Sequence, residues 1–175
     1  MSDASATTAA HPVEFGISMR LLRNAKGEAR RAEELGFDYL LTGEHIMFHT
    51  GTANNMVSLA AAAGATERIK LMSGIVLVPL YPVALLAKQA AGRDVVSDGR
   101  GHLGAGVGGE VPKEFEAVGV PVKERGARTN EALEVLDKLL SGPDVTFDGR
   151  FTKLDNFTIS PRGAQKPRIP FWVAG

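Results

Sequence analysis

Residues 69–106 read IKLMSGIVLVPLYPVALLAKQAAGRDVVSDGRGHLGAG and contain one complete strand–helix–strand pattern. The run 69–78 is almost entirely apolar, which is typical of a parallel strand covered on both faces. Pro82 suits the first turn of a helix, and Asp98-Gly99 indicates a turn before a further strand over 102–105. The segment therefore predicts two parallel strands joined by a helical crossover.

The same alternation continues on both sides of this unit. Apolar residues at helical spacing and short apolar runs between glycines and prolines define the other elements. Two β-rich runs around Asp148-Gly149 indicate a hairpin over 145–158. The remaining expected elements are strands over 13–18, 37–41 and 169–173 and helices over 22–35, 56–63 and 129–140.

Repeated strand–helix units predict an α/β fold with a parallel sheet, either a doubly wound sheet or a (β/α)₈ barrel. A full barrel takes about 250 residues, whereas this chain has 175 and ends just after its fifth expected strand. We therefore expect the chain to be cut rather than finished. Residues 1–12 are expected to form a disordered tail, and residues 13–175 to form the folded part.

The composition excludes several partners. Twenty basic residues balance twenty acidic ones, so the field that attracts nucleic acid or an anionic membrane is missing. The apolar run 71–87 is short for a membrane span and contains Pro79 and Pro82. Without cysteine, thiolate chemistry and cysteine-ligated metals are excluded. A cytoplasmic location is the default expectation, and we expect no membrane or nucleic-acid partner.

Ligands of both candidate folds gather at the C-terminal ends of the strands. Glu44-His45 follows the second strand, where an imidazole next to a carboxylate suits proton transfer; the alternative is a histidine that only binds backbone. We expect no metal, because His45 and His49 lack the HExxH order.

Glycines mark the other strand ends. Gly74 interrupts the third strand, as a packing glycine or as a point of close approach to a flat ligand. Residues 104–109 match G-x-G-x-x-G, but no acidic residue ending a strand follows at the distance that dinucleotide binding requires. We expect only that the backbone of residues 104–109 lacks side chains so that another group can approach it closely. Ala174-Gly175 could offer backbone N–H groups to a phosphate.

Together these motifs resemble the bacterial luciferase-like family of flavin- and deazaflavin-dependent oxidoreductases. The resemblance runs from about residue 13 to the end of the chain and covers the first half to two-thirds of such a protein. Its parts are Glu33-Glu34-Leu35-Gly36-Phe37-Asp38, Gly43-Glu44-His45, Arg68-Ile69-Lys70-Leu71, Gly104-Ala105-Gly106-Val107-Gly108-Gly109-Glu110, Glu114-Phe115-Glu116-Ala117-Val118-Gly119-Val120-Pro121, Arg125-Gly126-Ala127-Arg128 with Glu131-Ala132-Leu133, and Pro170-Phe171-Trp172-Val173-Ala174-Gly175.

The resemblance implies a partial (β/α)₈ (TIM) barrel of strands one to five, with a β-hairpin insertion before strand five. Its rim would hold coenzyme F420, our first choice, or FMN. His45 would lie near the reactive face of the ring, with Glu44 replacing the Asp common among F420 users. The third-strand bulge, with Ser73 before it, would carry a cis peptide at Gly74-Ile75 that backs the ring.

Further site residues also follow from the resemblance alone. Val107, Gly108 and Gly109 would face the cofactor, and Glu110 is the candidate for the carboxylate proton donor of some F420-dependent members. Arg125 and Arg128 would bind the cofactor phosphate, or pair on the surface with Glu124 or Glu131. Ala174 and Gly175 would begin the phosphate-binding segment.

The predicted function is therefore an oxidoreductase that transfers hydride between a small-molecule substrate and F420 or FMN, as a homodimer. One alternative is a non-catalytic half-barrel that folds by self-association and binds no flavin. A weaker alternative is a nucleotide-binding doubly wound protein built around residues 104–109.

Overall fold

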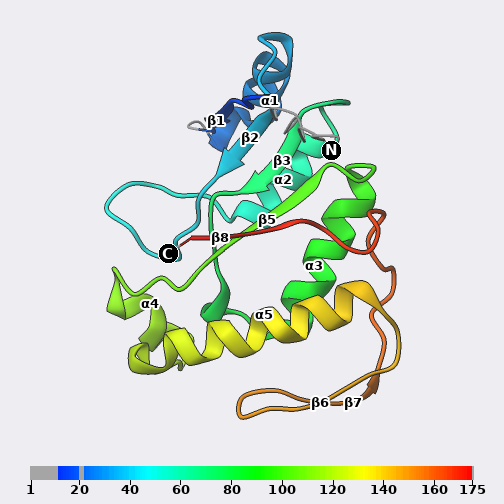
Figure 1. The fold of residues 1–175 in the computed structure, drawn as a ribbon. Coiled ribbons are helices and arrows are strands. Elements are labelled where there is room, and N and C mark those ends of the chain that lie inside the picture. The colour runs from blue at the N-terminus through cyan, green and yellow to red at the C-terminus, as the bar shows by residue number, and fades with distance from the viewer. Residues whose placement is uncertain (1–11, 20–21, 175) are drawn as a thin grey trace, which may run out of the picture.

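Apart from the short β4, the strands of the main sheet lie in the order in which they occur along the chain (Figure 1). The computed structural model describes residues 12–19 and 22–174. The parallel neighbours in succession are β1 (Gly16–Ser18), β2 (Tyr39–Thr42), β3 (Lys70–Ser73), β5 (Gly101–Gly106) and β8 (Phe171–Val173). Doubly wound sheets reverse their strand order at a switch point, whereas this sheet does not. The doubly wound alternative is therefore wrong, and the sheet has the strand order of a partial (β/α)₈ barrel.

The third expected strand, 69–78, is divided in the structure. β3 ends at Ser73, a cis peptide joins Gly74 to Ile75, and β4 (Val76–Leu77) follows. β3 pairs with the start of β5 and β4 with its end. The single long strand was a wrong prediction, because an apolar run shows burial on both faces but not a break in the pairing. A 3₁₀ turn, η2 (Val78–Leu80), then leads away from the sheet.

Helices cover the outer face of the sheet, each in contact with the next (Figure 1). They are α1 (Ala25–Glu34), preceded by a 3₁₀ turn η1 (Leu22–Asn24), α2 (Asn55–Ala63), α3 (Val83–Val96) and α5 (Arg125–Ser141). Two apolar clusters lie beneath them, one around Leu86, Leu103 and Leu136 and one around Leu40 and Leu59. Burial of these side chains fixes the curved sheet against the helices.

Two helix starts differ from the sequence-based expectation. Pro82 is the cap before α3 rather than a residue of its first turn, with an extended backbone that brings the chain into the helix. α5 begins at Arg125, four residues before the predicted start, because the 3₁₀ turn η3 (Val122–Glu124) leads directly into it. The charged residues of this first turn lack the apolar spacing on which the prediction relied.

The connection from β5 to β8 contains the remaining elements. A short helix, α4 (Pro112–Ala117), follows the glycine-rich segment, and the predicted hairpin is present as antiparallel β6 (Val145–Asp148) and β7 (Lys153–Phe157). The expected tail, 1–12, lies outside the described residues except for Pro12. In the described part of the chain, no helix is both long and apolar enough to cross a membrane.

Candidate active site at the strand ends

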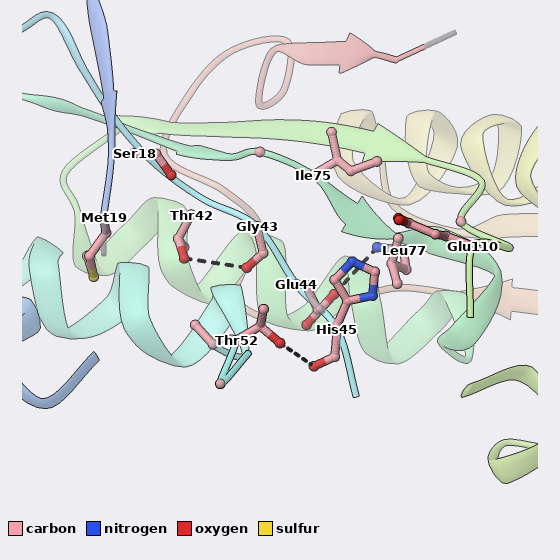
Figure 2. Close-up of a pocket in the computed structure, with 14 residues that line it drawn as sticks. Ser18, Met19, Thr42, Gly43, Glu44, His45, Thr52, Ile75, Leu77 and Glu110 are labelled. Atoms are coloured by element: carbon pink, nitrogen blue, oxygen red, sulfur yellow. Dashed lines mark hydrogen bonds between the residues drawn. The ribbon is translucent and has the colours of Figure 1, made fainter. Parts of the chain in front are cut away.

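A cleft of about 410 Å³ opens at the C-terminal ends of the strands, where the sequence pattern placed the site (Figure 2). It lies between the loop after β2, the break between β3 and β4, and the loop after β5. Its walls are Ser18, Met19, Thr42, Gly43, Glu44, His45, Gly51, Thr52, Ala53, Gly74, Ile75, Leu77, Gly108 and Glu110. The structure therefore brings six of the predicted site residues together around one opening: Glu44, His45, Gly74, Ile75, Gly108 and Glu110.

His45 is held from behind by a carboxylate that the sequence analysis did not single out. Its Nδ1 atom lies 3.1 Å from Oε2 of Glu114, a side chain that is 1% exposed. The imidazole also stacks on Phe48, with ring centroids 4.2 Å apart. These two contacts fix the ring plane and leave the opposite edge of the imidazole in the cleft.

Glu114 also fixes the loop that carries His45. Its Oε1 atom accepts hydrogen bonds from the backbone N–H groups of Ile46 and Met47. Glu114 stands in the first turn of α4, two residues after Pro112. In the sequence such a glutamate indicates only a favourable charge at a helix start. Its contact with His45, which lies 69 residues away in the chain, is visible only in the folded structure.

Glu44 turns its carboxylate into the protein next to β4. Oε1 accepts from the Tyr81 hydroxyl and from Asn54 Nδ2 at 3.2 Å, and Oε2 accepts from the backbone N–H of Leu77 at 3.4 Å. Burial raises the pKa of this carboxyl despite those donors, and burial likewise raises the pKa of Tyr81. With both oxygens engaged, Glu44 joins the loop after β2 to β4.

The third-strand bulge contains the cis Gly74-Ile75 bond that the resemblance implied. Ser73 is fully buried and does not line the cleft. Its hydroxyl donates to Asn55 Oδ1 at 3.4 Å and accepts from Arg93 Nη1 at 2.8 Å, while Asn55 Nδ2 donates to the Ile75 carbonyl at 3.4 Å. Ser73 thus holds the bulge from beneath, and Gly74 and Ile75 form the wall.

The glycines of segment 104–109 lack side chains for different reasons, because their neighbours differ. A Cβ at Gly104 would lie 2.0 Å from the Ser73 carbonyl oxygen, and one at Gly106 would lie 1.9 Å from Ile75 Cδ1. At these two positions the group that closely approaches the bare backbone is the third strand itself. Gly108 lines the cleft, whereas Gly109 lies against Arg125.

Glu110 and Val107 flank these glycines. Glu110 is exposed, and Figure 2 shows its carboxylate directed toward the side of the cleft that holds His45. Val107 is 39% exposed but is not among the residues that line the cleft. Of the two, only Glu110 therefore faces the opening.

The arginines expected at a phosphate lie outside the cleft. Arg128 pairs with Glu124, with Nη2 2.9 Å from Oε2, and covers the ring of Phe151, which is the surface pairing considered from sequence. Arg125 donates to the Val122 carbonyl at 3.1 Å and lies beside Gly109. No lysine or arginine is among the residues that line the cleft in the described chain.

The residue that follows β8 was expected to begin a phosphate-binding segment. Ala174 follows β8, and its N–H donates to the Ala105 carbonyl at 3.0 Å, so this N–H is engaged in the sheet. Gly175 lies outside the described residues.

Within residues 12–19 and 22–174, no three His, Asp or Glu side chains are grouped so that they could hold a metal ion.

Comparison with known proteins gives a consistent result. The family described as luciferase-like monooxygenases matches residues 4–175. An FMNH(2)-dependent dimethylsulfone monooxygenase of Pseudomonas putida is 31% identical over 153 residues, which are 84% of this chain and 42% of that protein.

Solved structures also match. The monooxygenase RslO1 of Streptomyces bottropensis has a TM-score of 0.84 at 31% identity, over 92% of this chain and 53% of that one. The coenzyme F420-dependent tetrahydromethanopterin reductase of Methanopyrus kandleri has a TM-score of 0.78 at 26% identity, over 93% and 50%. The chain thus spans about half the length of the proteins that it matches.

Proposed function

Because the chain belongs to the luciferase-like monooxygenase family, we propose that its cleft holds the ring of reduced FMN in an enzyme that oxidises a small-molecule substrate. The observation that carries the proposal is the opening at the strand ends, where an oriented imidazole faces the backbone of Gly74-Ile75 across a cleft of about 410 Å³. Such clefts at strand ends are the usual ligand sites of barrels.

The choice of FMN over F420 reverses our first expectation from sequence. Support for FMN comes from the dimethylsulfone monooxygenase, whose name states FMNH(2) dependence, at 31% identity. The F420-dependent reductase is less similar, at 26% identity. The coarser assignment, an oxidoreductase of the flavin and deazaflavin type, is common to both.

The walls of the cleft fit the ring of a flavin better than its phosphate. Gly43, Gly74 and Gly108 leave backbone bare on three sides, and a Cβ at Gly51 would meet no atom within 4 Å. Because no cation among the described residues lines the cleft, we infer that the phosphate is held by groups beyond these walls, with Arg125, beside Gly109, as a candidate on the β5 side.

The chain's own residues then have separate tasks. Reduced FMN would supply two electrons for oxygenation by O₂, in which one oxygen atom goes to the substrate and the other to water. His45 would hold or accept a proton at the imidazole edge in the cleft, and Glu110 would donate or accept one from the opposite wall. Glu44 and Ser73 would support the walls, and Ile75 would exclude water from the ring.

Fluorescence titration of the purified chain with FMN and with F420 tests this proposal. We expect saturable FMN binding that Thr52→Trp abolishes, because the indole would fill the cleft, and that Thr146→Trp on the distant hairpin leaves unchanged. F420 binding without FMN binding would overturn the choice of cofactor. Binding of neither would favour the non-catalytic half-barrel.

The open edges of the sheet favour an additional proposal, self-association. Among the described residues β1 pairs only with β2 and β8 only with β5, and Ile17, Trp172 and Val173 beside these edges are 37%, 46% and 65% exposed. Unpaired strand edges with apolar side chains bind other chains readily. We expect a homodimer in light scattering coupled to size exclusion, and a stable monomer would contradict it.

A further inference from the structure

We propose that Glu114 is a positioning residue that fixes the tautomer of His45, with the proton on Nδ1 and the free lone pair of Nε2 in the cleft. This inference rests on the proposed function for its catalytic meaning, but its structural part can be measured without any cofactor. The starting observation is the contact of 3.1 Å between Nδ1 and Glu114 Oε2, at a carboxylate that is almost fully buried.

The hydrogen-bonding capacity of the two groups gives the direction of the bond. An ionised carboxylate can only accept, and a neutral imidazole donates from one nitrogen and accepts at the other. Glu114 Oε1 is occupied by the backbone N–H groups of Ile46 and Met47, which can only donate. With Glu114 ionised, Oε2 therefore accepts a hydrogen bond from Nδ1–H, and within the described chain no group bonds Nε2. The free edge of His45 becomes a proton acceptor.

Two other glutamates show that the amide contacts alone do not explain Glu114. The carboxylate of Glu33 accepts from three successive backbone N–H groups, those of residues 67–69, and the carboxylate of Glu131 accepts from those of residues 150–152. Both hold a chain segment, and among the described residues neither bonds a histidine. Glu114 binds two amides with one oxygen and leaves the other for His45, so it combines loop anchoring with control of a titratable ring.

The consequence for the site is a defined polarity. The imidazole presents an acceptor toward the wall formed by Ile75 and Glu110 (Figure 2). Such a residue behind a catalytic histidine acts through orientation and tautomer rather than by touching the substrate. A residue that acts through His45 and does not touch the substrate should change turnover more than substrate affinity.

Glu114→Gln is the sharpest test. The amide oxygen of glutamine can keep both backbone N–H donors, but its NH₂ group must donate to Nδ1 and so moves the imidazole proton to Nε2. We expect long-range ¹⁵N–¹H spectra of the cofactor-free chain to show His45 protonated at Nδ1 when neutral, and at Nε2 in the variant. His45→Asn assigns the signals. In assays with reduced FMN, the kcat of Glu114→Gln should fall at least about tenfold, while its KM for the substrate stays within about threefold of the wild-type value.

Glu131→Gln is the matched control, because it alters an equally engaged carboxylate that holds amides without a histidine. It should leave the His45 tautomer and kcat unchanged. A wild-type His45 protonated at Nε2 overturns the proposal, and so does an unchanged tautomer in a folded Glu114→Gln. The wild-type spectrum decides even where the variant does not fold. If the tautomer is as expected but FMN does not bind, the proposed function fails while this inference stands.

Discussion

The two ends of the strands each carry a histidine, and the two histidines are held in opposite ways. His45 follows the C-terminal end of β2 and presents Nδ1 to the carboxylate of Glu114. His102 lies near the N-terminal end of β5, 9% exposed, and its Nδ1 accepts from the indole N–H of Trp172 at 3.1 Å. Since an indole N–H can only donate, neutral His102 carries its proton on Nε2.

The surroundings also differ. Burial, followed by the charges of Lys70 and Arg93, lowers the pKa of His102 to about 4, while Glu14 and Asp94 oppose the shift. The edge of Tyr39 packs against its ring at 5.1 Å between centroids. His102 is thus a neutral packing residue inside the curved sheet, whereas His45 lies in an open cleft. The comparison teaches that the end of the strand, rather than the residue type, separates a structural histidine from a functional candidate.

The largest effect is expected at the residue that joins the two ends. Arg93 is 3% exposed and donates to Ser73 Oγ beneath the cleft and, at 2.7 Å, to the carbonyl of His102. Arg93→Ala should lower the free energy of unfolding by about 3 to 5 kcal/mol, since it leaves a cavity and two buried acceptors without this donor. Urea denaturation measures it. Exposed Arg31→Ala is the control, within about 0.5 kcal/mol of wild type.

The next effect separates packing from ligand contact in the glycine-rich segment. Gly104→Ala should cost about 3 kcal/mol of stability, because the new Cβ meets a backbone carbonyl that cannot move aside. In Gly106→Ala the new Cβ meets the end of the Ile75 side chain. Because that side chain can rotate, stability should fall less than in Gly104→Ala. Because Ile75 lines the cleft, FMN affinity should decrease. Equal losses of stability in both variants would contradict this account of the two neighbours.

A third prediction concerns acid sensitivity at the N-terminal end. The folded pKa of His102, about 4, lies below its ordinary 6.5, so the unfolded chain binds more protons between these values and stability falls as pH decreases through that window. The full loss of stability across this window is about 3 kcal/mol. His102→Gln should flatten the pH dependence of the urea midpoint there. An unchanged pH dependence in this variant would refute the assignment.

The smallest effect on stability is expected at Glu33, whose carboxylate accepts hydrogen bonds from the backbone before β3. Burial raises the pKa of Glu33, but the N–H donors of Ile69, Arg68 and Glu67 outweigh burial and lower the pKa overall. Its contribution is therefore present at neutral pH and lost as pH falls through the carboxylate range. Glu33→Gln should cost about 1 kcal/mol at pH 7 and nothing in acid. A loss that persists in acid would point to packing instead of charge.

Much of the fold could be predicted from the chain alone, because periodicity depends on local residue order. The apolar run 69–78 and the repeated helices gave the parallel sheet, and the motifs placed His45, Gly74 and Glu110 at the strand ends. The strand order that rejects a doubly wound sheet came only from pairing in space, as did the separate pairing of β3 with the start of β5 and of β4 with its end.

What only the tertiary structure decided is the partner of each polar group. Glu114 reaches His45 across 69 residues, and Arg93 reaches the Ser73 hydroxyl across 20. Sequence spacing carries no information about such contacts, since burial and pairing depend on how distant elements pack. Residue order therefore determined which elements form, and packing determined which of their side chains face the cleft and which hold it in place.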